Sequence, residues 1–528
     1  MKLSNYISNI KNKTDDIFRD NFFSGCVLVF CIVMLSLFPL FCIDRYFNIS
    51  IAKFVFFMVS FVLLTGAYTY SNYNKDKTKT NKTIFTSTDY AAAIFLLIGV
   101  ISTIFSRHPL ASLAGKYNAG EYSYGRFGGL IFYTVCFVVY FFISRYLRYT
   151  KKLLSVFFTV GSAMFIMAVF QKLGYNVFGF YNGVSEEQQN AFIGTIGNVD
   201  FFSLFVLIVL SLSSCMFIIS ANKKYTVFYA FVSFISFMGL IAGNSAGVFF
   251  AVCVMICVLS VYCLKSIITI LRFLYILLFF LLSFKIMNFL VINISAKNKE
   301  FEKIYDMLIK STYIYILIAV IVFLILIFKF LNIKKYNPIR TMRFLRYADI
   351  AILSLGFIAF AYGIYYYSVK NTETDAGVFS NYFRFTDSWG SGRGFVWNNT
   401  IKAFFDGSIF NKLFGHGFEN FYPVFDDVIQ GRHFDAAHNE VLHHAICVGI
   451  LGVAAYIAFV FSLVVRCFKG IKNRPELLCF AVCILCYFAA SLGNLAQVMV
   501  TPLFFVVCGI AGAVLGGDFE GEKSIGYD

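Results

Sequence analysis

The chain has 528 residues and a formal net charge of +16. Hydrophobic residues make up 59% of it and charged residues only 14%, and the mean hydropathy is +0.76. Soluble proteins average about 45–50% apolar and about 25% charged residues. This composition excludes an ordinary cytosolic enzyme, a disordered chain and a nucleic-acid-binding domain. The apolar runs are about 20 residues long, whereas barrel strands are about ten and alternate. We therefore predict an all-α polytopic membrane protein.

The first 23 residues are polar, and the apolar run that follows has the length of a membrane span, so we expect it to remain as an anchor rather than to be cleaved as a signal peptide. About 12–14 transmembrane helices are predicted, two of which (90–105 and 478–492) are short enough to be re-entrant. The candidate spans are 24–43, 52–70, 90–105, 128–147, 153–171, 200–220, 225–242, 246–264, 272–293, 312–331, 348–369, 441–464, 478–492 and 499–516.

The distribution of Lys and Arg predicts the topology. With the N-terminus inside, the inside segments carry 27 of these residues and the outside segments 16, six of them in the longest loop. Because Lys and Arg collect in cytoplasmic segments, both termini are expected in the cytoplasm. The predicted organisation is a cytoplasmic tail (1–23), a helix bundle (24–369), a large extracytoplasmic loop (370–440), C-terminal helices (441–516) and an acidic cytoplasmic tail (517–528).

The predicted loop contains a segment suited to binding phosphate. Arg393 and Trp397 are four residues apart and would share one face of a helix. Gly415-His416-Gly417 allows a tight turn in which backbone can approach a ligand. A guanidinium can donate two bonds to one phosphate. The alternative is an arginine in a surface ion pair.

His438 stands where the chain re-enters the membrane, followed by Asn439 and Glu440 at the start of an apolar run. An imidazole there can accept a hydroxyl proton, although it could equally be an interfacial residue next to a helix cap. Glu440 and His443 have the Glu-x-x-His spacing of di-iron bundles, but the spans offer essentially no further carboxylates. We predict no metal site and no cofactor.

Two further outward segments carry candidate binding residues. Lys116 and Arg126 lie among several tyrosines and could hold a lipid phosphate and a sugar, or could anchor the chain at the interface. Asn198 follows glycines directly before an apolar run, which suggests either a backbone anion site or a packing turn.

These segments, in this order, resemble the O-antigen ligase/O-antigen polymerase family of bacterial envelope glycan enzymes, over roughly residues 90–515. The resemblance rests on Ser106–Gly129, Gly194–Asn198, Gly392-Arg393 with Trp397 and Gly415–Gly417, His438-Asn439 with Gly449–Gly452, and Gln497 through Thr501-Pro502 to Gly509. The family often has Ser-Arg-Gly at the outer end of a middle helix, where this chain has Ser245-Ala246-Gly247. Another cation would have to replace that arginine, and Arg126, Arg384 and Arg432 are candidates.

The resemblance implies metal-independent glycosyl transfer at the outer face of the bacterial cytoplasmic membrane. The donor would be a glycan on undecaprenyl pyrophosphate, and the acceptor a hydroxyl of a glycan or glycolipid. The expected partners are these substrates and membrane lipid, without nucleic acid. His438 would be the general base, and Arg393 the catalytic cation together with Arg126. The other predicted substrate-binding residues are Lys116, Arg384, Arg432, Trp397, Asn198 and Asn439.

Two other interpretations remain open from the sequence. A transporter or flippase of lipid-linked glycans would suit the number of helices, although transporters usually hold paired ionisable groups at mid-membrane and Lys285 is nearly the only candidate here. A non-catalytic family member is the other alternative. Polymerase and ligase share their donor chemistry and differ in the acceptor, so the sequence does not separate them.

Overall fold

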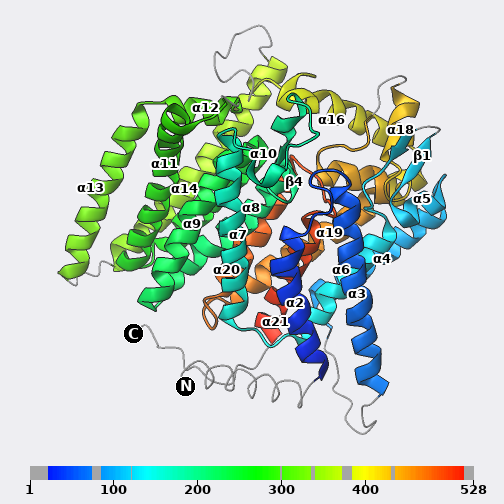
Figure 1. The fold of residues 1–528 in the computed structure, drawn as a ribbon, viewed down its shortest axis with the longest axis horizontal. Helices are drawn as coiled ribbons and strands as arrows, with labels where there is room; N and C mark the ends of the chain where they lie inside the picture. Colours follow the sequence, from blue (N-terminus) through cyan, green and yellow to red (C-terminus); the bar gives the residue numbers. More distant parts are fainter. Residues whose placement is uncertain are drawn as a thin grey trace.

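A computed structural model describes residues 22–73, 85–119, 122–297, 300–334, 339–370, 383–429 and 434–516. Within these ranges, eleven helices are long and apolar enough to cross a membrane, and three shorter apolar helices accompany them. Each of the fourteen candidate spans overlaps one of these helices. The prediction of an all-α polytopic membrane protein is therefore confirmed (Figure 1).

The helices of membrane length are α2 (Phe22–Leu40), α3 (Ile49–Tyr73), α4 (Ser87–Ile104), α7 (Lys151–Lys172), α8 (Val199–Ile219), α9 (Lys223–Gly243), α10 (Ala246–Cys263), α11 (Ile267–Ile294), α13 (Tyr313–Ile333), α14 (Ile339–Tyr365) and α19 (Glu440–Gly470). The shorter apolar helices are α6 (Leu130–Tyr146), α20 (Leu477–Ser491) and α21 (Thr501–Gly516). The connecting elements are α5 (Pro109–Ala114), β1 (Tyr117–Ala119), β2 (Tyr122–Tyr124), η1 (Val177–Gly179), η2 (Gln188–Ala191), β3 (Phe192–Ile193), β4 (Gly197–Asn198), α12 (Lys303–Lys310), η3 (Tyr366–Lys370), α16 (Trp389–Asp406), α17 (Ile409–Phe414) and α18 (Phe421–Val428).

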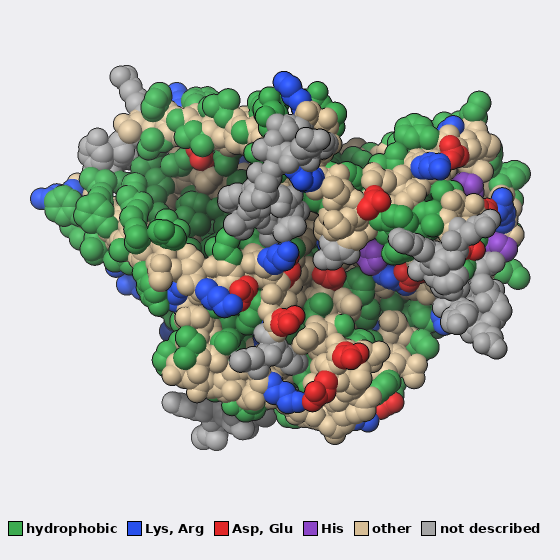
Figure 2. Space-filling view, turned by 90° about the horizontal axis from the view of Figure 1, so that it is seen from above, with side chains coloured by type: hydrophobic (Ala, Val, Ile, Leu, Met, Phe, Trp, Pro, Cys, Tyr) green, Lys and Arg blue, Asp and Glu red, His purple; other side chains and the backbone are tan. Residues whose placement is uncertain are grey.

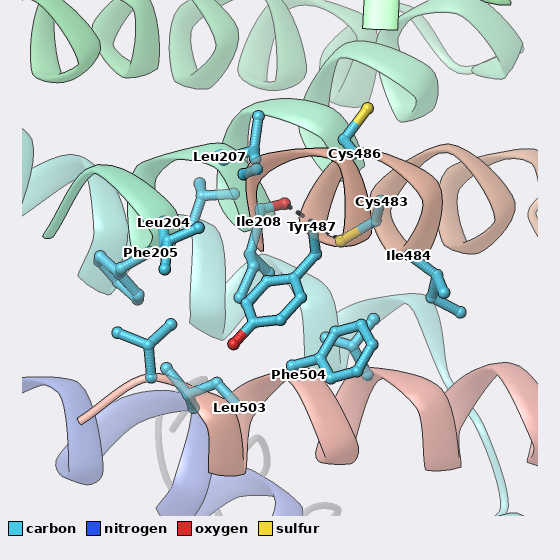
Figure 3. Packing of buried hydrophobic residues seen from close by; sticks show 14 of the residues in the cluster. Leu204, Phe205, Leu207, Ile208, Cys483, Ile484, Cys486, Tyr487, Leu503 and Phe504 are labelled. Carbon is cyan, nitrogen blue, oxygen red and sulfur yellow. Dashed lines mark hydrogen bonds between the residues drawn. The ribbon is translucent and has the colours of Figure 1, made fainter. Parts of the chain in front are cut away.

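The core of the bundle lies around α8, whose most apolar window is 94% buried. A helix that is apolar on all sides is stable only when other helices surround it, and α8 packs against α9 and α20. Figure 3 shows α20 and α21 meeting beside α8, where the rings of Tyr487 and Phe504 stack with their centroids 4.1 Å apart. The buried Tyr487 hydroxyl lies 3.1 Å from the Thr501 hydroxyl, so its polar atom is satisfied within the core.

The helices at the edge of the bundle are much less buried. Of the residues in the apolar stretch of each helix, 11% are buried in α13 and 0% in α14. α13 forms the left edge of the bundle in Figure 1. Long apolar surfaces of this kind suit contact with lipid tails.

The connections at the upper end of the bundle in Figure 1 carry the polar elements, which include α12, α16, α18 and β1. We call this end the site end. The described part of the predicted loop 370–440 is largely helical, forming α16, α17 and α18. Seen from above, this face has charged side chains across its middle and a hydrophobic left edge (Figure 2). Several segments distant in sequence therefore meet there.

Candidate functional site

A crossing of two backbones fixes the loop before the site against α19. α19 is interrupted at Gly449, which has a φ of 68°. The amide of His416 donates to the Ile446 carbonyl (2.9 Å), and the amide of Gly417 donates to the Cys447 carbonyl (2.8 Å). A Cβ at Gly415 would lie 2.4 Å from the Cys447 backbone, closer than real Cβ atoms come. The glycines therefore bring this loop against α19 instead of presenting its backbone to a ligand.

Two polar contacts position His438. The indole nitrogen of Trp397, on α16, donates to the Ala437 carbonyl at 3.0 Å. The Asn439 side chain caps α19 by accepting a hydrogen bond from the Leu442 amide at 3.1 Å. His438 stands between these anchored residues with a φ of 49°, a left-handed conformation that is uncommon outside glycine. The neighbouring contacts hold the imidazole at the beginning of α19.

Two ion pairs lie close to this histidine. Arg126 donates from Nε and Nη2 to the two carboxylate oxygens of Asp435, at 2.8 and 2.7 Å. Arg393, near the start of α16, places Nη2 3.6 Å from Oδ2 of Asp200. Because Arg126 uses two of its donors on one carboxylate, Arg393 is the less constrained of the two guanidiniums.

Asp200 also joins the site to α10. Its Oδ1 accepts a hydrogen bond from the Ser245 hydroxyl at 2.6 Å, and Ala246 is the first residue of α10. Through Asp200, Arg393 is linked to the turn at Ser245 and Ala246. The family resemblance predicts an arginine at position 246 of this turn. Arg126, one of the predicted candidates for this role, is paired with Asp435 instead.

The electrostatic surroundings keep His438 neutral. Burial lowers its pKa to about 4, with further lowering by the charges of Arg126 and Arg393 and opposition from Asp435 and Asp200. These four charged groups therefore all act on one imidazole. Burial alone would raise the pKa of Asp435, but the charge and hydrogen bonds of Arg126 lower it overall. At neutral pH the site thus holds an uncharged imidazole between ionised pairs.

A second group of polar residues near Arg126 is buried, and it includes Glu419. Glu419 accepts a hydrogen bond from the Gly128 amide at 3.1 Å, and burial raises its pKa to about 7, despite the opposing charge of Arg126. A cavity of about 10 Å³ adjoins it, which is close to the space that one water needs. Polar side chains around this cavity are those of Arg126, Glu419, Glu440, His443, His444 and Gln497.

The other predicted binding residues have different surroundings. Lys116 places Nζ 4.6 Å from the centre of the Phe127 ring. Asn198 caps α8, its side-chain oxygen accepting from the Asp200 amide at 2.9 Å, which agrees with the packing-turn alternative. Arg384 lies between Phe383 and Phe385, both of which have backbone atoms hydrogen-bonded to the Ser368 hydroxyl. Arg432 lies outside the described residues.

The acidic members of the site were not anticipated from the sequence. Asp200 has the appearance of an ordinary first-turn acid of α8, and Asp435 and Glu419 are two of several acids in a long polar segment. The weak signal available was their rarity: Asp and Glu number only 28 in 528 residues. In a chain with so few acids, an Asp or Glu close in sequence to a predicted site His or Arg is itself a candidate site residue.

The arrangement combines a neutral proton acceptor with two cations, at the end of a membrane-length bundle. Such a set can accept a proton from a hydroxyl and stabilise negative charge on a leaving phosphate. Residues 307–457 match a family model described as O-antigen ligase. The match begins within α12, ends within α19, and includes Arg393, Trp397 and His438. No curated protein matches the chain.

Proposed function

The match of residues 307–457 to the O-antigen ligase family model supports a role as a glycan ligase or polymerase, and we propose that the protein transfers a glycan from undecaprenyl pyrophosphate to a sugar hydroxyl. The reaction takes place at the outer face of the bacterial cytoplasmic membrane and needs no metal. The acceptor is a glycan or a glycolipid. The termini then lie in the cytoplasm, as the distribution of Lys and Arg predicts. The observation that carries this proposal is the neutral His438 beside Arg126 and Arg393.

The proposed step needs one base and a stabilised leaving group. The acceptor oxygen forms a bond to the anomeric carbon of the donor, and the bond from that carbon to the phosphate oxygen breaks. The hydroxyl proton passes to His438, and undecaprenyl pyrophosphate leaves with the electron pair. Negative charge grows on the pyrophosphate as the bond breaks, so cations aimed at it lower the barrier. Arg393 is the principal cation, because Arg126 already holds Asp435 with two donors.

Donor binding would also strengthen the base. Arg126 and Arg393 are among the causes that lower the pKa of His438. A bound pyrophosphate offsets their positive charge, and the pKa of the imidazole then rises toward its ordinary value. His438 would become an effective proton acceptor only when the donor is present. The same two guanidiniums thus couple donor binding to base strength.

The contacts of the Ser245–Ala246 turn support a specific role for Arg393. The resemblance leads one to expect a cation at position 246, and Asp200 joins Arg393 to Ser245 there. We assign to Arg393 the pyrophosphate contact that Ala246 lacks. The candidates from the sequence, Arg126, Arg384 and Arg432, stay predictions for the same contact.

A transporter or flippase would be expected to hold ionisable groups within the membrane for its substrate. Lys285 and Lys53, which are both buried, do not support such a role. Lys285 donates from Nζ to the carbonyls of Ile309 (2.9 Å) and Ser311 (2.6 Å), beside the end of α12. Lys53 donates to the carbonyls of Phe38 and Pro39 near the end of α2. Both lysines satisfy helix C-termini, which is a structural role. The charged side chains of the site instead gather at one end of the bundle.

The test is transfer of a lipid-linked glycan by the purified protein in lipid vesicles. We expect His438→Ala and Arg393→Ala each to lower the rate at least about 100-fold, because general bases and charge-stabilising donors contribute about this much. The control is Lys297→Ala, which removes an exposed cation paired with Glu186. Wild-type rates in both site variants would contradict the assignment of residues. Transport of the donor without transfer would favour the flippase.

A further inference from the structure

A large cavity lies in the half of the bundle farther from His438. Its volume is about 1420 Å³, beyond the range of about 300–1,000 Å³ typical of small-molecule sites. It is lined by the end of α8, the later turns of α10, the beginning of α11, the middle of α14 and the connection between α19 and α20. We call it the lateral groove. Its walls are mainly apolar, with Val261, Ile350, Leu353, Phe357 and Ile358 among them.

The groove exists because α14 packs loosely. The apolar window of this helix is 0% buried, and it meets α10 through a hydrogen bond from the Ser260 hydroxyl to Asp349 (2.8 Å). An aliphatic wall exposed along a membrane-length helix is in contact with lipid tails. The groove is therefore open to molecules with long apolar chains.

Four basic residues line the groove, contributed by separate segments: Lys265, Arg272, Arg346 and Lys472. Arg272 donates to the Ile218 carbonyl at 2.8 Å and Arg346 to the Leu264 carbonyl at 3.4 Å. Nε of Arg346 is buried without a hydrogen-bond partner within the described part of the chain. A buried, unpaired guanidinium nitrogen is costly, and an anion in the groove would offset the charge of this guanidinium.

The charges in the groove repel one another. Burial lowers the pKa of Lys265, and the charge of Arg346 contributes in the same direction, opposed by Cys263. The acid beside them is Asp349, which is one turn from Arg346 on α14 and accepts the hydrogen bond from Ser260. The described residues that line the groove include these four cations and no acid, so the groove is positive and a bound anion would relieve the repulsion.

We propose that the lateral groove binds one anionic phospholipid of the inner leaflet. The phosphate lies against Lys265 and Arg346, with Arg272 and Lys472 close by, and the acyl chains lie along α10 and α14. Basic pockets between transmembrane helices on the cytoplasmic side recognise anionic headgroups in this way. The proposal rests on the proposed orientation of the chain and not on its transferase activity. The lipid would fill the space between α14 and the rest of the bundle.

The experiment measures lipid retained by the full-length protein. Protein is reconstituted in bilayers containing phosphatidylglycerol and phosphatidylcholine in equal amounts, extracted in detergent and analysed by native mass spectrometry. We expect one retained phosphatidylglycerol and little phosphatidylcholine. The double variant Lys265→Gln/Arg346→Gln should retain about 30-fold less phosphatidylglycerol, since each of the two basic residues contributes about 1 kcal/mol near an anionic surface.

Two comparisons make the result specific. The variant Lys223→Gln/Lys224→Gln removes two exposed charges at the beginning of α9 that are not among the residues lining the groove, and it should retain lipid as the wild type does. Val261→Trp fills the groove without changing its charge and should also lose the lipid. Equal retention of both lipids, undiminished retention in the Gln double variant, or a second copy of the chain in place of lipid would overturn the proposal. Because glycan transfer is measured separately, its loss or persistence does not affect this result.

Discussion

The guanidinium of Arg393 lies 3.6 Å from the carboxylate of Asp200, joining the segment before α19 to the first turn of α8. Asp200 in turn accepts a hydrogen bond from Ser245 at the beginning of α10. Three separate parts of the chain thus meet at one carboxylate. Both members of the ion pair are partly exposed, with 22% and 30% of their side-chain surface accessible, so the contact is worth little for stability and more for orienting the guanidinium.

The first prediction concerns this orientation. Asp200→Asn should lower kcat for glycan transfer about tenfold or more, because Arg393 loses the charge that aims it. The melting temperature should change little, since a partly exposed pair contributes at most about 1 kcal/mol. Steady-state kinetics and thermal unfolding measure the two effects separately. Glu186→Gln, which removes the exposed partner of Lys297, is the matched control. A large fall in stability with unchanged kcat would contradict the orienting role.

The second prediction is a shift in pH dependence. The pKa of His438 is lowered to about 4, partly by the charge of Arg126. Arg126→Gln should therefore raise this pKa, and the acid limb of the kcat/KM profile should move to higher pH. Lys297→Gln should leave the profile unchanged. An acid limb that stays in place in Arg126→Gln would show that His438 is not the group that titrates.

The same shift has a consequence for stability. The pKa of His438 in the folded protein is below its usual value of about 6.5 in an unfolded chain. The folded state therefore favours the neutral imidazole, and this contribution is present above about pH 6.5 and is lost as the pH falls toward 4. His438→Gln should reduce the dependence of the melting temperature on pH in that interval.

The third prediction concerns Glu419, whose pKa is raised to about 7 by burial. The folded state favours its protonated form, so its contribution to stability is complete below about pH 4.3 and is lost as the pH rises through 7. Glu419→Gln keeps a neutral group of similar shape and should lessen the decrease in melting temperature between pH 6 and pH 8. An unchanged decrease would mean that Glu419 does not ionise in this interval.

The fourth prediction concerns the backbone crossing at α19. A Cβ at Gly449 would lie 2.3 Å from the Leu413 carbonyl oxygen, and its φ of 68° disfavours other residues. Gly449→Ala should destabilise the protein by about 2 kcal/mol or more, because strain in the left-handed region alone amounts to about 1–2 kcal/mol. Gly356→Ala, on α14 with open space around it, should be neutral or slightly stabilising. The melting temperatures of the two variants are compared in the same lipid, and equal melting temperatures would contradict the prediction.

The sequence predicted the fourteen helices because the length and hydropathy of an apolar run are local properties, and the bilayer imposes a fixed length on each of them. It also suggested His438, Arg393 and Trp397 as candidates, because histidine and tryptophan are rare in this chain, with six and two residues, and charged residues make up only 14% of it. Their spacing along the chain carries no information on distance in space. Beyond the helical face shared by Arg393 and Trp397, the helices within 383–429 were not foreseen. α16, α17 and α18 all pack on α19, and most helical stability in proteins comes from such packing rather than from local sequence.

The tertiary structure alone decided which charges face each other. Arg126 pairs with Asp435 and Arg393 with Asp200 across long separations in sequence, and no local pattern encodes such a pairing. The lowered pKa of His438 has the same origin, because burial and neighbouring charges exist only once α6, α8, α16 and α19 have packed together. Hydropathy acts residue by residue along the chain, whereas electrostatics acts through space, so the first could be inferred from the sequence and the second required the fold.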